Sequence, residues 1–434
     1  MAAVPALTDA ADSEAKPGHG RRASRGPSAL EQHISRTRMT NLPPKARAED
    51  VKHLSDFEEM MKLYKQSERK RQELDEERKR VKDAELSAAQ SIWSDEILPS
   101  WTRARREARL RQVWWRGAPP NLRGRVWALA CGNAQMLPRN LFTSAASAAR
   151  TARADGTFPA SDDEAIEADI ASTLPSLKLF QRDTGPLFDD LRDVSRARTH
   201  AGAKRGADCH SVPGAAPLAA MLLANLSPSE TLVALLNLLA ERPWLRALYA
   251  PAPAPAAGDT HLHTKTPGAP AFRQDAAAGF ERVFDTLLAD QMPKVYANMQ
   301  ARGVRPSAYV RDWVRTLFVP FLPFDAVARL WDCILLEEGD ALIFRAGLAI
   351  VKLLSARLYA PDRAELTSIL RGNNAAALRV YYRDASMDAA WVPRDNVYAQ
   401  YGIGEEQLFA TLEEQNEWWR DSTLERLLDR ELSG

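Results

Sequence analysis

A series of apolar stretches with helical spacing, separated by proline or glycine, constrains the fold of this chain more than any other feature. Apolar residues recur every three or four positions in FERVFDTLLADQMPKVYANM, YVRDWVRTLF, FDAVARLWDCILL and ALIFRAGLAIVKLL. Another stretch, SPSETLVALLNLLA, opens with a capping box in which Ser227 is the N-cap and Glu230 follows three residues later. No run alternates as strands do, so the sequence predicts an all-α fold.

The predicted core begins near residue 92, where tryptophan becomes frequent. Trp93, Trp101, Trp114, Trp115 and Trp127 lie close together in the sequence. Aromatic side chains bury large areas. We therefore expect residues 92–430 to form one packed domain.

The first part of the chain has a different composition. Residues 1–45 are rich in Ala, Ser, Gly, Pro and Arg and have almost no aromatics. They cannot bury enough apolar surface to offset the entropy of ordering, so we expect a disordered tail. Within the tail, RRAS ends at Ser24 and resembles a basophilic kinase site, although a random basic segment is the simpler interpretation.

Residues 46–91 are predicted to form a charged helical extension. An apolar stripe with helical spacing opens it, consisting of Val51, Leu54, Phe57, Met61 and Tyr64. From Lys65 to Glu85 most residues are charged and the signs are mixed, which suits a solvated helix with i,i+4 ion pairs. A coiled-coil or tethering partner that binds residues 65–85 is the alternative.

Bulk properties indicate a protein of the cytoplasm. The 434 residues carry a formal net charge of +1, so no overall field favours nucleic acid. The three cysteines, Cys131, Cys209 and Cys333, are far apart and predict reduced thiols rather than a disulfide framework. The N-terminus lacks a signal-peptide pattern, and the most apolar segments are too short to span a bilayer.

We expect no cofactor and no metal. The sequence contains no GxxxxGK[ST] phosphate loop, no HExxH and no G-x-S-x-G. His261 and His263 lie in a Pro/Gly-rich loop without a third ligand nearby in the sequence. These absences favour a binding module over an enzyme with chemistry of its own.

Three segments resemble the signatures of TBC domains, the helical fold of Rab GTPase-activating proteins (GAPs). Residues 114–133, WWRGAPPNLRGRVWALACGN, are similar to its first signature. Residues 309–354 resemble its later part, with R-x-W-D at 329–332. Between them, IEADIASTLPSLKLFQ matches the motif I-x-x-D-x-x-R-T-x-P at Ile166, Asp169, Thr173 and Pro175.

The resemblance also implies a domain organisation. NLPPKARAEDVKHLSDFEEMM is similar to the N-terminal extension of one TBC subgroup, whose relatives act in autophagy-linked traffic. The family fold has two helical lobes with a groove for the GTPase. Here it implies an N-lobe over about 92–245, a loop over 250–272 and a C-lobe over about 273–430.

Two catalytic positions of the family pattern are altered. Family members use an arginine finger and a glutamine in a Y-x-Q-G-M motif. Ser172 stands at the arginine, Pro213 at the glutamine and Gly214 at the following glycine. Serine has no charge and proline has no side-chain amide. An arginine finger contributes about 10³- to 10⁵-fold in rate, so we expect little or no GAP activity.

The remaining motif residues, Asp169, Thr173, Pro175 and Gly214, are expected to face the GTPase by resemblance, although a helix cap and a turn would need the same residues. The predicted function is a regulator that binds a GTP-bound Rab-type GTPase in endomembrane and vesicle traffic, with peripheral membrane association through partners.

Two alternatives stay open at this point. One is an active GAP that uses a relocated cation, for which Lys178, Arg182, Arg192, Arg196 and Arg198 are the candidates. The other is a helical interaction scaffold that binds no GTPase.

Overall fold

The structure is a computed structural model that describes residues 47–204, 214–249, 271–384 and 396–432. Throughout these ranges the regular elements are helices and no strand occurs, which confirms the all-α prediction. No helix in the same ranges combines the length and apolarity that a membrane span needs.

Several predictions concern residues outside the described ranges. They are the disordered tail 1–45, nearly all of the loop 250–272, and the single residues Ser24, Cys209, Pro213, His261 and His263. The lobe limits near residues 245 and 273 also stay predictions.

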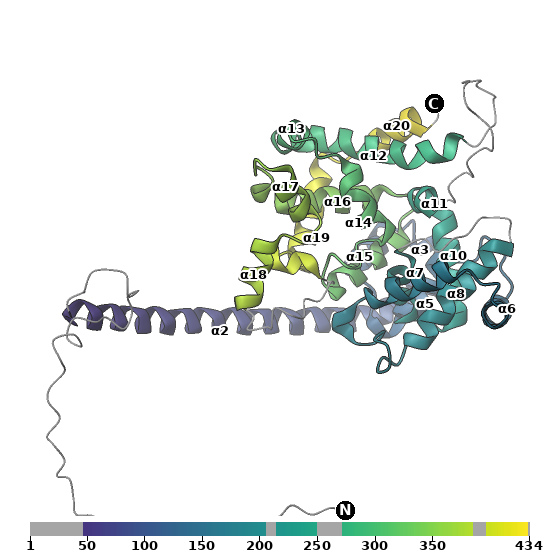
Figure 1. The fold of residues 1–434 in the computed structure, drawn as a ribbon, viewed down its shortest axis with the longest axis horizontal. Coiled ribbons are helices and arrows are strands. Elements are labelled where there is room, and N and C mark those ends of the chain that lie inside the picture. Colours follow the sequence, from purple (N-terminus) through teal and green to yellow (C-terminus); the bar gives the residue numbers. More distant parts are fainter. Residues whose placement is uncertain (1–46, 205–213, 250–270, 385–395, 433–434) are drawn as a thin grey trace, which may run out of the picture. The chain divides into compact units, whose positions relative to one another are not determined.

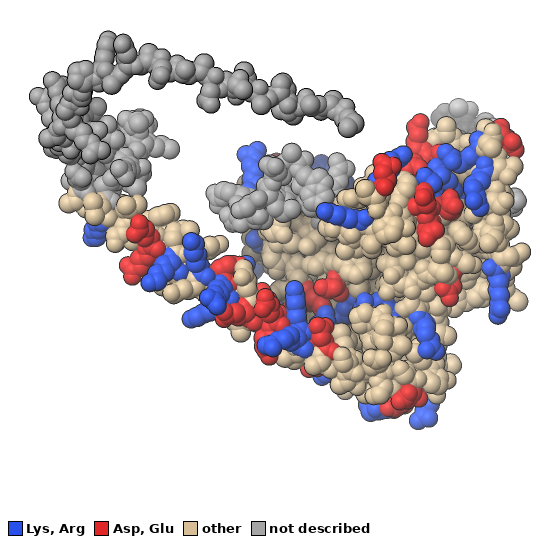
Figure 2. Space-filling model, turned by 90° about the horizontal axis from the view of Figure 1, so that it is seen from below, with Lys and Arg blue, Asp and Glu red and all other residues tan. Residues whose placement is uncertain are grey.

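The chain divides into two compact units, Met1–Ala84 and Glu85–Gly434. Helix α2, Arg47–Ile92, begins in the first unit and confirms the helix predicted after residue 46. Figure 2 shows Lys and Arg interspersed with Asp and Glu along it. The ion pairs on this helix include Arg69–Glu73 and Arg71–Glu68, each at 3.0 Å. Four of the five residues of its apolar stripe are exposed, Phe57 for example at 53%, and Met61 is half-buried.

In the second unit, one group of helices packs around α8 (Figure 1). Helix α8, Phe188–Lys204, contacts α6, α7, α9 and α10. The helices of this group are α3 (Trp101–Ala104), α4 (Ala108–Trp115), α5 (Pro120–Cys131), α6 (Leu141–Ala154), α7 (Ala160–Ala171), α8, α9 (Ala215–Leu223), α10 (Pro228–Glu241) and α11 (Pro243–Tyr249).

The remaining helices form a second group, in which α12 packs on α20 and α16 on α19. Helix α15 contacts α4 and α5 and so joins the two groups. This group comprises α12 (Ala271–Gln291), α13 (Pro293–Ala301), α14 (Val310–Arg315), α15 (Phe324–Leu336), α16 (Ala341–Leu354), α17 (Arg363–Leu370), α18 (Ala375–Asp384), α19 (Glu405–Glu414) and α20 (Asp421–Leu432).

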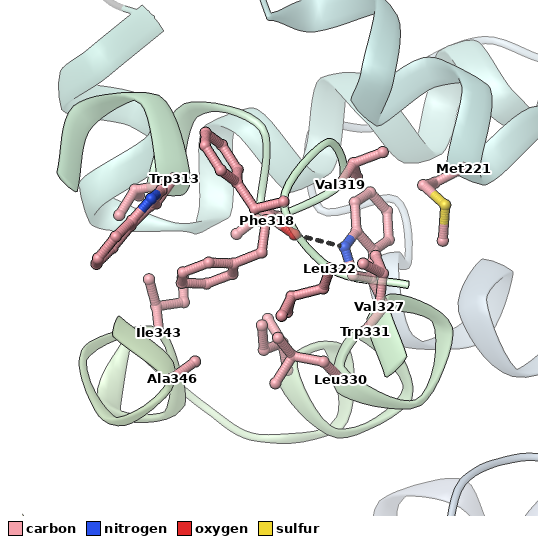
Figure 3. Packing of buried hydrophobic residues seen from close by; sticks show 14 of the residues in the cluster. Met221, Trp313, Phe318, Val319, Leu322, Val327, Leu330, Trp331, Ile343 and Ala346 are labelled. Atoms are coloured by element: carbon pink, nitrogen blue, oxygen red, sulfur yellow. Dashed lines mark hydrogen bonds between the residues drawn. The ribbon is translucent and has the colours of Figure 1, made fainter. Parts of the chain in front are cut away.

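The core lies within the second unit and is rich in aromatic residues. Trp114, Trp127, Trp313 and Trp331 are all buried, as their motif positions predict. Figure 3 shows Trp331 among Val319, Leu322 and Val327, with its indole N–H donating to the Leu317 carbonyl at 3.1 Å. A buried indole N–H needs such a partner.

Asp332 joins the first and last signature segments. Its carboxylate accepts hydrogen bonds from the Trp127 indole at 2.7 Å, the Ala118 backbone N–H at 2.9 Å and the Arg123 guanidinium at 3.1 Å. Asp332 is fully buried and Arg123 nearly so. Burial raises the pKa of Asp332, and Arg123 opposes that shift. Residues of the first and last signature segments therefore form one buried polar contact.

Candidate functional site

Ser172 and Gly214 belong to segments that meet where α7 ends and α9 begins. Ser172 is the C-cap of α7, and Gly214, the residue after Pro213, is the N-cap of α9. Every residue of α9 is buried. Its first N–H groups lack intrahelical partners and must find acceptors inside the protein.

Asp169, in the last turn of α7, supplies those acceptors. Its carboxylate oxygens accept from the backbone N–H of Gly214 at 3.0 and 3.1 Å and from that of Ala216 at 2.8 Å. A carboxylate at a helix N-terminus also interacts favourably with the helix dipole. Burial raises the pKa of Asp169, while the hydrogen bonds from Ala216 and Gly214 act in the opposite direction.

The hydroxyl groups of the motif point back into α7. Ser172 Oγ donates to the Asp169 carbonyl at 2.9 Å, and Thr173 Oγ1 donates to the same oxygen at 2.7 Å. Thr173 is buried, and Pro175 begins the short turn Pro175–Leu177. These contacts give Asp169, Thr173 and Pro175 roles within the fold. Their contact with a GTPase stays a prediction.

Gly214 is held against Arg315 of α14. Its φ is +96°, and a Cβ built there would lie 2.9 Å from both Cγ and Cδ of Arg315. The position therefore requires glycine for two reasons, a positive φ and a close approach. The chain thus brings a cation from residue 315 to the site predicted from residues 169–214.

A second arginine and a tyrosine complete this cluster. The Tyr249 hydroxyl donates to the Arg315 carbonyl at 2.8 Å. Burial raises the pKa of the Tyr249 phenol, and the positive charges of Arg198 and Arg315 counteract the shift. Arg198 and Arg315 also act on the Asp169 carboxylate. Asp169, Arg198, Gly214, Tyr249 and Arg315 are called the α7–α9 cluster below.

The other four cations named from the sequence form ion pairs with acidic residues other than Asp169 or are exposed. Arg196 bonds to Asp163 at 2.7 Å and Glu167 at 3.1 Å, and Arg182 bonds to Glu167 at 2.6 Å. Arg192 pairs with Asp189 at 2.5 Å. Lys178 is exposed in a turn. Of the five cations named from the sequence, only Arg198 is among those that act on Asp169.

Sequence reasoning missed Arg315 and Tyr249. Both come from helices far along the chain, α14 and α11, which contact each other. No spacing rule relates residues 249 and 315 to residue 214, so no sequence signal could have placed them there. Within the described ranges, no three His, Cys, Asp or Glu side chains come together as metal ligands would.

Comparison with known proteins identifies similar chains. A sequence model of the Rab-GTPase-TBC domain family matches residues 120–255 and 261–359. Human TBC1 domain family member 14 is 30% identical, over 78% of this chain and 47% of that protein. TBC1 domain family member 12 of Rattus norvegicus is 29% identical, with the same coverage. The chain spans about half the length of these curated relatives.

A third relative and two solved structures extend the comparison. A TBC domain-containing protein of Schizosaccharomyces pombe is 27% identical, over 80% of this chain and 70% of that protein. The Chlamydomonas flagellar RabGAP TBC domain superposes with a TM-score of 0.46 at 20% identity, covering 76% of this chain and 93% of that one. The Ypt/Rab-GAP domain of Gyp1p superposes with a TM-score of 0.49 at 16% identity, covering 77% and 97%.

Proposed function

Because this chain belongs to the Rab-GTPase-TBC domain family, we propose that it binds a GTP-bound Rab-type GTPase and accelerates GTP hydrolysis weakly or not at all. The observation that carries the proposal is Ser172 at the arginine-finger position. Its hydroxyl is short and uncharged and donates to the Asp169 carbonyl. A neutral group bonded within its own helix cannot neutralise charge on a transferring phosphoryl group.

The surroundings of Ser172 support retention of a binding site. Asp169 connects the end of α7, which carries Ser172, to the start of α9 through three hydrogen bonds from Gly214 and Ala216. This contact supports a binding site that keeps the end of α7 and the start of α9 together. We propose that the domain acts in endomembrane and vesicle traffic, including autophagy-linked traffic, and reaches membranes through its partners.

A panel of Rab proteins tests this proposal. The full chain would be titrated against each Rab loaded with GTP or GDP, and single-turnover GTP hydrolysis would be followed for every Rab that binds. We expect preferential binding of at least one GTP-loaded Rab and acceleration below about a hundredfold.

The other outcomes identify the alternatives. Acceleration well above a hundredfold would show an active GAP with a relocated cation. Absence of GTP-dependent binding across the whole panel would show a helical scaffold that has lost the GTPase.

A further inference from the structure

Arg198 and Arg315 come from two helices that reach the α7–α9 cluster. Helix α8, which carries Arg198, packs on both α7 and α9, and the stem of Arg315 lies against Gly214. Guanidinium groups stay charged at any pH that proteins experience. Asp169 is the acidic group on which both of them act, and its oxygens already accept three backbone N–H bonds. Within the described part of the chain, neither arginine forms an ion pair with Asp or Glu. The α7–α9 cluster therefore carries excess positive charge.

Both arginines are also short of hydrogen-bond partners. The Nε atoms of Arg198 and Arg315 are buried and have no acceptor among the described residues. Each side chain as a whole is only half-buried, and its terminal nitrogens are not among the buried atoms that lack a partner. A desolvated N–H without an acceptor costs about 1–3 kcal/mol, and more when it belongs to a charged group. An oxyanion that entered the cluster would offset this cost.

The packing of Arg315 indicates which oxyanion fits. Its Cγ and Cδ lie against Gly214, and the Tyr249 hydroxyl holds its backbone carbonyl. The stem of the side chain is therefore packed into the domain rather than extended away from it. The γ-phosphate of GTP lies inside the nucleotide site of the GTPase, where only a projecting side chain reaches it. The carboxylate of an exposed partner residue can instead come to the arginines.

We propose that Arg198 and Arg315 form a binding site for a carboxylate, which an Asp or Glu of the bound GTPase supplies. The guanidinium group of arginine can donate two parallel N–H···O hydrogen bonds to the two oxygens of one carboxylate. The inference rests on the proposed function for the identity of the partner. The anion site itself can be tested without any GTPase.

The first experiment uses acetate as the probe. Thermal unfolding of the full chain is measured in sodium acetate and in sodium chloride at equal ionic strength. Binding to the folded state raises its stability by mass action. We expect acetate to raise the unfolding midpoint more in the wild type than in the double variant Arg198→Gln/Arg315→Gln. Equal responses would overturn the anion site.

A matched control separates this effect from a general loss of charge. Arg192→Gln removes an arginine from the same helix, α8, where it pairs with Asp189. This variant should respond to acetate as the wild type does, and a loss of response here would count against a localised site. Should the double variant fail to fold, Arg198→Lys and Arg315→Lys provide the comparison, since lysine keeps the charge but loses the fork.

The second experiment uses a GTP-loaded Rab that binds the wild type. We expect each single Arg→Gln variant to weaken binding at least tenfold. Acidic switch residues of the Rab are then replaced singly by their amides, and one of them should show coupling with Arg198 or Arg315 in a double-mutant cycle. If binding is unchanged in the variants, the carboxylate proposal fails while the proposed function stands.

Two further results have distinct meanings. If no Rab binds the wild type, the proposed function fails and the acetate comparison alone decides on the anion site. If the variants bind normally but lower the rate of GTP hydrolysis, the arginines act on the nucleotide phosphate, and the assignment to a protein carboxylate is overturned.

Discussion

Asp332 and Gly214 show how single residues hold distant segments of this chain together. Asp332 accepts from Arg123, Trp127 and Ala118, which lie some two hundred residues earlier in the sequence. Gly214 lets Arg315 approach a helix N-terminus from another part of the fold. Asp332 does so as a buried charge that is paired with Arg123. Gly214 does so because it has no side chain and leaves room for Arg315.

Replacement of Asp332 by Asn should strongly destabilise the protein. All three partners donate hydrogen bonds, and an amide can accept with only one of its two polar atoms. The partly buried Arg123 would also lose its fully buried counter-charge, so we expect a cost of about 3–5 kcal/mol. Chemical denaturation measures it. Asp325→Asn, an exposed position on the same helix, is the control and should cost little. A near-neutral Asp332→Asn would contradict the role given to this contact.

Gly214→Ala should cost more than Gly339→Ala. Both glycines have positive φ, +96° and +72°, so alanine is strained at each by roughly 1–2 kcal/mol. Only at residue 214 would the new Cβ meet another group, the Arg315 stem at 2.9 Å. Overpacking adds about 1–3 kcal/mol. Equal losses of unfolding free energy in the two variants would show that Arg315 moves aside freely.

Helices α9 and α10 are consecutive but begin in different ways. Helix α10 starts with the capping box Ser227–Glu230, which is local and readable from the sequence, and the structure confirms it. Helix α9 starts at Gly214 without a side-chain cap of its own, and Asp169 of α7 satisfies its first N–H groups instead. The sequence predicts local caps well because their geometry depends on spacing. A cap supplied by another helix depends on packing, which spacing does not encode.

Because spacing does not encode packing, sequence reasoning could find only part of the candidate site. The motif around Asp169 and the Ala-rich start of α9 are visible as patterns, and the resemblance to TBC domains predicts that both belong to one site. Arg315 belongs to a stretch whose pattern indicates only a helix with Trp313 in the core. Its opposite face reaches Gly214 because α14 packs against α11, and only the assembled fold shows this.

Removing the Asp169 cap of α9 should lower the free energy of unfolding more than removing the Ser227 cap of α10. Asp169→Ala leaves two N–H groups of a fully buried helix without acceptors, at about 1–3 kcal/mol each. Ser227→Ala removes an exposed cap that water can replace, at about 1 kcal/mol. Unfolding free energies of the two variants provide the comparison. If Ser227→Ala were the more costly change, another group would have to satisfy the start of α9.

At the scale of the whole molecule, the division after Ala84 separates an exposed, charged stretch of the chain from the stretch that forms the core. Before it, the described part of α2 is charged and its apolar side chains are exposed. After it, the buried core begins at Trp93 and extends through Leu424. The composition shift near residue 92 made this change predictable, because aromatic content and helical periodicity reappear there together.

Fragment 85–434 should therefore fold as the full chain does. Among the described residues, none of those in the buried core lies before residue 85. We expect the thermal midpoints of fragment and full chain to agree within a few degrees. A fall of more than about 5 °C, on the order of 1 kcal/mol or more, would show that the first unit contributes to stability.

Restoring both finger residues tests whether the whole molecule still presents a GAP site. Ser172→Arg combined with Pro213→Gln would supply a cation and an amide at the two altered positions. Because both groups act on one transition state, neither change alone should achieve as much as the pair. The new arginine would enter a region where Arg198 and Arg315 already act on Asp169, so like-charge repulsion should limit the gain.

Even a tenfold rise in single-turnover hydrolysis, about 1.4 kcal/mol of barrier, would support retained geometry. The measurement requires a GTP-loaded Rab that binds both the wild type and the variant. A folded variant that binds such a Rab without any rate increase would show that residues 172 and 213 do not face the nucleotide.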